Sequence, residues 1–109
     1  MKHIDFTYED KAYKLAFSRE SVRNLESQGF DIEAISSQPV TMIPLLFYGA
    51  FGVYHRGIKR RKVDEIWNCI ADKNGLVLKL VELYGETIED LLEESEGTEA
   101  KKITWEVSQ

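Results

Sequence analysis

The chain has few cysteine, histidine and proline residues and no long apolar run. Its 109 residues include one cysteine, two histidines and two prolines. Cys69 alone cannot form an intramolecular disulfide, so we expect a reducing, cytoplasmic compartment. The longest apolar stretch, from Val40 to Tyr54, is shorter than the roughly 20 residues that a membrane span needs. We therefore expect neither secretion nor a membrane partner.

Residues that carry catalysis are also scarce. His3, His55 and Cys69 show no spacing typical of a catalytic triad, a metal site or a phosphate-binding loop. We expect both histidines to lie at the surface. We expect Cys69 to be a small buried apolar residue rather than a nucleophile. The sequence thus predicts no enzyme, no metal ion and no cofactor.

Length and charge indicate one small domain with an acidic tail. The chain carries 14 Lys and Arg against 19 Asp and Glu, a net charge of −5. The segment from Glu86 to Gln109 holds eight acidic residues and two lysines, a net of 2 − 8 = −6, which leaves about +1 on the rest. We expect a single domain over residues 1–92 and a flexible, acidic tail over 93–109.

Alternating apolar residues predict strands at both ends of the chain. Apolar and polar residues alternate around 4–8 and 13–17, which predicts a β-hairpin within 3–17 with a three- or four-residue loop. An isolated hairpin is marginal in water, so it must pack on a helix or gain a third strand. The alternation returns after the acidic segment. It predicts a strand over 102–107 that can pair with the hairpin edge of its own chain or of a neighbour.

Helical patterns fill the segment from 18 to 92. Ser18 is suited to cap a short first helix that ends at Gly29, and one or two further turns precede Pro39. An apolar helix over 41–55 follows, which Gly57 ends. The predicted class is mainly α within α+β: an N-terminal β-hairpin, a compact bundle of about four to five helices, and a flexible acidic C-terminal tail.

The last helices are open to two interpretations. Val63, Ile66, Trp67 and Ile70 follow the spacing of a buried helix face, and Asn74-Gly75 is expected to close that helix. A fourth helix over 76–84 is followed either by a fifth that begins at Thr87, or by one long helix that includes Gly85.

The helix over 41–55 is apolar on nearly every face. Such a helix lies either at the centre of a core or with one face covered by another chain. Its small residues Gly49, Ala50 and Gly52 allow another backbone to come close. The candidates for a face that binds another subunit or an apolar helical client are Leu45, Leu46, Phe47 and Phe51.

A basic run is the strongest charge feature of the chain. It consists of Arg56, Lys59, Arg60, Arg61 and Lys62. It can be a solvated loop, a contact for an acidic protein surface, or a phosphate contact of a nucleic-acid-binding regulator, which the acidic remainder of the chain makes less favoured. The acidic tail of another subunit can supply such a surface, or the tail can serve solubility alone.

The order of these elements resembles that of the tail assembly chaperones of long-tailed phages and prophages. The similarity covers roughly Ile4 to Leu92. It rests on the opening Ile4-Asp5-Phe6-Thr7-Tyr8 with its second strand, the apolar helix from Pro39 to Phe51, the helix that bears Trp67, and the run from Tyr84 to Leu92.

This resemblance implies a non-enzymatic protein of the infected bacterial cytoplasm. Such chaperones oligomerise around the helical, aggregation-prone tape measure protein and help to recruit tail tube subunits. A frameshifted longer form often contacts the tube protein. The expected partners are therefore further copies of the chain and the tape measure protein, with Ile103 and Trp105 as additional interface residues. A nucleic-acid-binding regulator and a minor structural tail component remain as alternatives.

Overall fold

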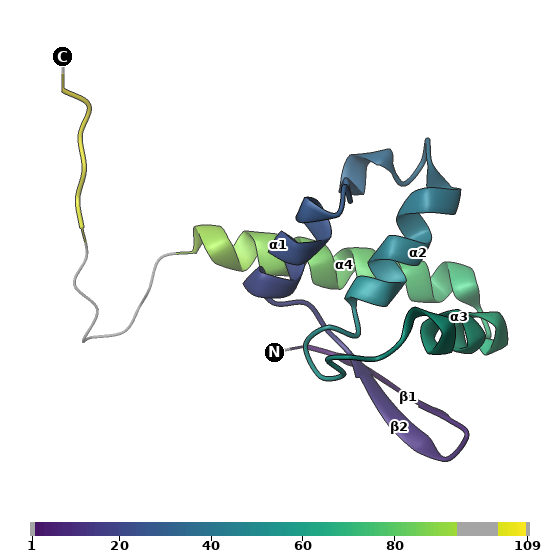
Figure 1. Ribbon diagram of the computed structural model, residues 1–109. Coiled ribbons are helices and arrows are strands. Elements are labelled where there is room, and N and C mark those ends of the chain that lie inside the picture. The colour runs from purple at the N-terminus through teal and green to yellow at the C-terminus, as the bar shows by residue number, and fades with distance from the viewer. Residues whose placement is uncertain (1, 94–102, 109) are drawn as a thin grey trace.

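The computed structural model describes residues 2–93 and 103–108. It confirms the predicted α+β class, because an N-terminal hairpin precedes four α-helices (Figure 1). The elements are β1 (Ile4–Tyr8), β2 (Lys11–Leu15), α1 (Arg19–Ser27), the 3-10 turn η1 (Ile32–Ala34), α2 (Pro39–Gly49), α3 (Arg60–Cys69) and α4 (Lys73–Leu92). The acidic segment 94–102 lies outside the described residues.

The hairpin turn is shorter than predicted. β1 and β2 are antiparallel, and Tyr8 pairs with Lys11, so the loop has two residues rather than three or four. Both of them, Glu9 and Asp10, have positive φ (50° and 65°). This is the conformation of a type I′ turn, whose twist matches that of the strands. The expected Gly or Asn signal is absent, which is why the sequence suggested a longer loop.

The predicted boundaries of the first helix are confirmed. The Ser18 side chain accepts from the backbone N–H of Ser21, and the Ser21 side chain accepts from that of Ser18, which forms a capping box. Gly29 has φ 93° just after the helix, where a left-handed residue is needed. The further turn before Pro39 is η1.

The apolar helix ends six residues earlier than predicted. α2 runs from Pro39 to Gly49 rather than over 41–55, and turns occupy 50–54. The carbonyl of Ala50 there accepts a hydrogen bond from the N–H of Ala16 at the end of β2 (3.0 Å). Tertiary contact with the hairpin therefore replaces the last helical turns.

The two interpretations of the last helices are settled in favour of one long helix. α4 continues through Gly85 to Leu92. Asn74 and Gly75 lie in its first turn instead of closing α3, and the Asp72 side chain caps it by accepting from the N–H of Gly75 (3.2 Å). In Figure 1, α4 runs behind α1 and α2, with which it is in contact.

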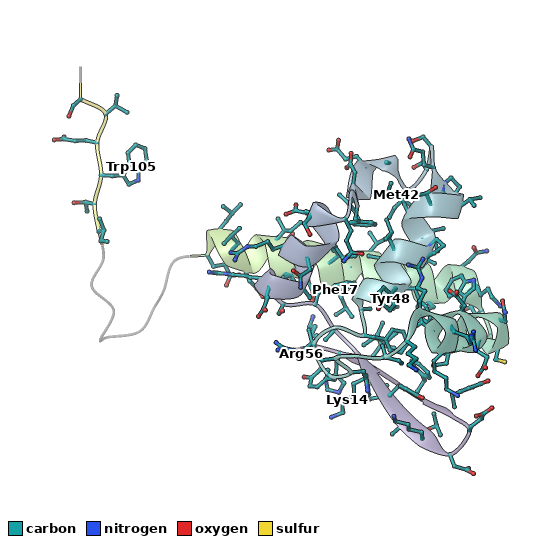
Figure 2. All side chains as sticks on the ribbon, in the orientation of Figure 1. Lys14, Phe17, Met42, Tyr48, Arg56 and Trp105 are labelled. Atoms are coloured by element: carbon teal, nitrogen blue, oxygen red, sulfur yellow. The ribbon has the colours of Figure 1, made fainter. Side chains whose placement is uncertain are left out.

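The core lies between the hairpin and the helices. Tyr84 of α4 packs edge-on against Phe17 and Phe30 (ring centroids 5.5 and 5.2 Å apart), and Phe51 contacts Phe6 and Phe47 in the same way. Phe17 is seen in front of α4 in Figure 2. No helix of the described residues is long and apolar enough to cross a membrane.

Candidate functional site

The apolar helix is not the surface that the sequence suggested. Leu46, Phe47 and Phe51 are almost completely buried in the chain's own core, so they are corrected from interface to core residues. Leu45 is half-buried. The physical reason is size: the helix is short enough for α1, α3, α4 and the hairpin to cover its large side chains. Gly49 serves contact within the chain, because the Leu25 side chain of α1 packs directly against it.

Most of the basic run is already paired. Arg56 lies 3.7 Å from Glu20, and Arg60 lies 3.8 Å from Asp64. Lys62 bridges Glu9 and Glu65, at 3.5 and 3.2 Å. Its hydrogen bond to Glu65 raises the pKa of the Lys62 ammonium.

Two members of the run remain without such pairs. Lys59 and Arg61 are exposed and form no ion pair with a described residue. The run is also not one loop, because Arg60, Arg61 and Lys62 form the first turn of α3. Lys59 and Arg61 are only two unpaired cations, which gives little support for binding of a nucleic-acid phosphate backbone.

His55 has a structural role that the sequence did not reveal. It is half-buried, and its Nε2 accepts a hydrogen bond from the backbone N–H of Lys14 in β2 (2.9 Å). Burial, together with the charge of Lys11, lowers the pKa of the imidazole. His3 is exposed as expected. Cys69 is exposed rather than buried, because the end of α3 turns that side chain away from the core.

A hollow of about 370 Å³ lies between α1 and the segment that follows α2. Its hydroxyl groups are occupied by the capping box, in which the Ser21 hydroxyl donates to the Ser18 carbonyl (3.1 Å). His55 is held by Lys14, and Arg56 bridges the hollow to Glu20. Lys14 and Arg56 mark this side of the molecule in Figure 2. Within 2–93 and 103–108, no group of three or more His, Cys, Asp and Glu residues is arranged to hold a metal ion.

The feature that the core leaves unexplained is a row of apolar residues on α4. We call it the α4 stripe: Leu78, Val81, Gly85, Ile88 and Leu92. Leu78 and Leu92 are 68% and 81% exposed, Ile88 is 38% exposed, and Val81 is half-buried. Leu80 and Tyr84 fill the core from the neighbouring face of the helix. The apolar arc of α4 is therefore wider than its own core requires.

The spacing of the α4 stripe fits a partner helix. Its members are separated by 3, 4, 3 and 4 residues, which is the spacing of a seam between packed helices. A side chain added at Gly85, in the middle, would meet nothing within 4 Å, so the chain's own packing does not require a glycine there. A mid-helix glycine costs about 1 kcal/mol of helix stability relative to alanine. A close approach by another helix would explain why a glycine occupies position 85.

A shallow groove continues the α4 stripe toward α1. This α1–α4 groove of about 150 Å³ shares Ile88 with the stripe. Its lining residues are Arg19, Val22, Arg23, Glu26, Thr87, Ile88 and Leu91. Arg19 and Arg23 form no ion pair with a described residue, so two cations flank apolar surface. A helix with an apolar face suits this surface, whose charged residues Arg19, Arg23 and Glu26 are of both signs.

The sequence contains the signal for the α4 stripe, but the interpretation with a fifth helix from Thr87 hides it. Ending a helix at Gly85 separates Leu78 and Val81 from Ile88 and Leu92. If α4 is treated as one continuous helix, the heptad spacing can be identified from the sequence alone.

The C-terminal residues are placed as exposed side chains. Ile103, Trp105 and Val107 are 80–89% exposed, and residues 103–108 are extended without forming a strand. Pairing with the hairpin of the same chain is therefore not observed. Figure 2 shows Trp105 on this segment with no helix beside it.

Comparison with known proteins yields one match. A family model described as "Domain of unknown function (DUF5055)" matches residues 1–109. No curated protein and no solved structure matches the chain.

Proposed function

We propose that this chain, which belongs to the DUF5055 family, is a non-enzymatic tail assembly chaperone of long-tailed phages or prophages. In this role it oligomerises and binds the tape measure protein during tail morphogenesis. The proposal joins the resemblance in element order to the surface described above. The α4 stripe replaces the buried helix α2 as the proposed client-binding surface.

The observation that carries the proposal is the exposed heptad spacing of the α4 stripe. A long helical client with its own apolar row can pack against Leu78, Ile88 and Leu92 by inserting side chains between them. Fully burying one leucine or isoleucine stabilises by about 1.5–3 kcal/mol, so three such contacts support useful affinity. An apolar surface of this kind promotes aggregation when it is exposed to water. A partner that covers the α4 stripe is therefore the physical explanation for it.

The test is the soluble yield of the co-expressed tape measure protein. The variant is Leu78→Glu with Leu92→Glu, which places two charges in the α4 stripe at exposed positions. We expect the wild-type chain to keep the client soluble and to co-purify with it. We expect the variant to lose most of that effect while its circular dichroism spectrum stays unchanged.

A charge-matched control separates the stripe from a general effect of acidity. Ser36→Glu with Asn68→Glu adds the same charge at exposed positions elsewhere in the domain. The control should solubilise the client as the wild type does. Equal solubilisation by the α4 variant would remove the stripe from the proposal. Detection of the chain in finished particles would instead favour the alternative of a minor structural tail component.

A further inference from the structure

The hairpin has one covered edge and one open edge. Beside a two-residue turn, the pair Tyr8 and Lys11 exchanges backbone hydrogen bonds, and every second pair does the same. The N–H and C=O groups of Asp5 and Thr7 therefore point away from β2. Neither residue forms a backbone hydrogen bond with a described residue on that side.

The outer edge of β2 is different. There the N–H of Lys14 donates to His55, and the N–H of Ala16 donates to the carbonyl of Ala50. The fold thus occupies the outer edge of β2 at Lys14 and Ala16, and it leaves the outer edge of β1 as a template for a further strand.

An apolar groove of about 350 Å³ runs along the open edge. Figure 1 shows that β1 is the strand of the hairpin nearer α3. We call it the β1 groove. Besides β1 itself, it is lined by Ile66, Cys69, Ile70, Ala71 and Leu76. The Tyr8 hydroxyl donates to Glu65 at 3.3 Å, which ties β1 to α3 at one end of the groove.

A strand added to β1 would place every second side chain over this groove. The added strand shares the face of Ile4, Phe6 and Tyr8, which all turn toward the core side. The complementary element therefore needs an extended backbone and apolar residues at alternate positions. Such recognition combines main-chain hydrogen bonds with pockets for alternate side chains.

The chain itself contains that element. Residues 103–108 form no helix and are drawn as an elongated trace in Figure 1, and Ile103, Trp105 and Val107 are exposed at alternate positions. We infer that residues 103–107 of one copy add as a third strand to β1 of a second copy, with Trp105 over the β1 groove. The inference rests on the proposed self-association and names the surface that would carry it. This surface differs from the α4 stripe, so client binding can be retained where strand exchange fails.

Charge favours a second copy over the same chain. The β1 groove lies beside Leu76 near the start of α4, whereas the tail departs after Leu92, about 24 Å away along the helix, so a tail that reached its own groove would have to run back along α4. A tail that returned to its own groove would bring its acidic residues beside those of α4, and like charges repel. These residues are Glu82, Glu86, Glu89 and Asp90 in α4 and Glu93, Glu94, Glu96 and Glu99 beyond it.

The first test measures the mass of the full chain by light scattering over a wide concentration range. Trp105→Asp should weaken self-association by roughly tenfold or more, because an aromatic anchor is replaced by a charge. Thr104→Asp is the matched control, since that side chain alternates to the solvent face. Association that survives Trp105→Asp unchanged would overturn the inference.

The second test combines two defective copies. Thr7→Pro removes one outward N–H of β1 without touching the bonds to β2, and Thr7→Val is its control. The Trp105→Asp variant keeps an intact β1 edge that can accept a strand, and the Thr7→Pro variant keeps an intact segment 103–107 that can be donated. Each should be monomeric alone, and their mixture should form a one-to-one dimer. If Thr7→Pro does not fold, the Trp105→Asp result and the thiol measurement below decide.

Cys69 provides an internal reporter, because it lines the β1 groove and is the only thiol of the chain. Its reaction with a chromogenic disulfide reagent should slow as concentration rises, and Trp105→Asp should abolish that slowing. Slow reaction at every concentration, with a monomeric mass, would mean that the tail occupies its own groove. Fast reaction in an associated wild type would place the interface elsewhere. Either result contradicts exchange between copies.

Discussion

His55 connects the segment after α2 to the hairpin through a single hydrogen bond. Its Nε2 can accept from the N–H of Lys14 only while that nitrogen carries no proton. Burial and the nearby Lys11 charge oppose protonation and lower the pKa below the ordinary value of 6.5. The unfolded chain therefore binds the proton more readily than the folded one.

The stability that His55 contributes is present above pH 6.5 and is lost as the pH falls below that value. We expect the free energy of unfolding to decrease between pH 7.5 and 5.5, by at most about 1.4 kcal/mol per pH unit from this group. Urea titrations at each pH measure it. His55→Gln keeps an acceptor without a titrating proton and should flatten this part of the profile. An identical slope in His55→Gln and in the control His3→Gln would disprove the assignment.

Gly49 and Gly85 are both helical glycines, but they differ in their surroundings. At Gly49 an added methyl group would overlap the Leu25 side chain, so α1 or α2 must shift. Overpacking of this kind typically costs about 1–3 kcal/mol. We expect Gly49→Ala to lower the free energy of unfolding by about 1–2 kcal/mol in urea titrations, and a gain in stability would show that α1 has room to move.

Gly85→Ala should have the opposite effect. The added methyl group meets nothing within 4 Å, so only the helix propensity changes. We expect the free energy of unfolding to rise by about 0.5–1 kcal/mol, measured in the same titrations. A loss of stability would mean that the chain's own packing requires the glycine. Gly85 would then be no evidence for a closely packed partner helix.

At the element scale, the hairpin turn is locally unfavourable. Asp10 holds φ at 65°, a region that costs residues other than glycine free energy. Asp10→Gly should therefore stabilise the domain by about 0.5–1 kcal/mol and raise its melting temperature, and Asp10→Ala should not. Calorimetry of the two variants decides, and equal melting temperatures would argue against the two-residue turn.

The elements were predictable where local chemistry decides them. Ser18 and Gly29 mark the boundaries of α1 because capping needs only neighbouring residues. The end of α2 was not predictable, because the carbonyl of Ala50 turns toward Ala16, far away in the sequence. The continuity of α4 through Gly85 likewise depends on tertiary contacts, because Leu80 and Tyr84 are buried before Gly85 and the Thr87 hydroxyl donates to the carbonyl of Phe17 after it (3.4 Å).

The candidate site was predictable only in part, for the same reason. Hydrophobicity alone marked Phe47 and Phe51 as surface candidates, although they are the centre of the core. Leu78 and Leu92 are no more apolar, but no other element covers them. Which apolar residues remain exposed is a property of the whole assembly of helices, and a one-dimensional pattern does not contain it.

For the molecule as a whole, we propose two separate binding surfaces. The α4 stripe lies along the helix that closes the core, and the β1 groove lies on the open edge of the hairpin. Assembly would then use one surface for further copies and leave the other for a helical client.

Hydrogen–deuterium exchange of the chain, alone and bound to the tape measure protein, locates the client-binding surface. Amides between Gly85 and Leu92 near the end of α4 should exchange readily in the free chain, where the helix end frays. In the complex we expect marked slowing across 78–92, and little change in α3. Unchanged exchange in α4, with slowing confined to other elements, would contradict the assignment of the α4 stripe as the client-binding surface.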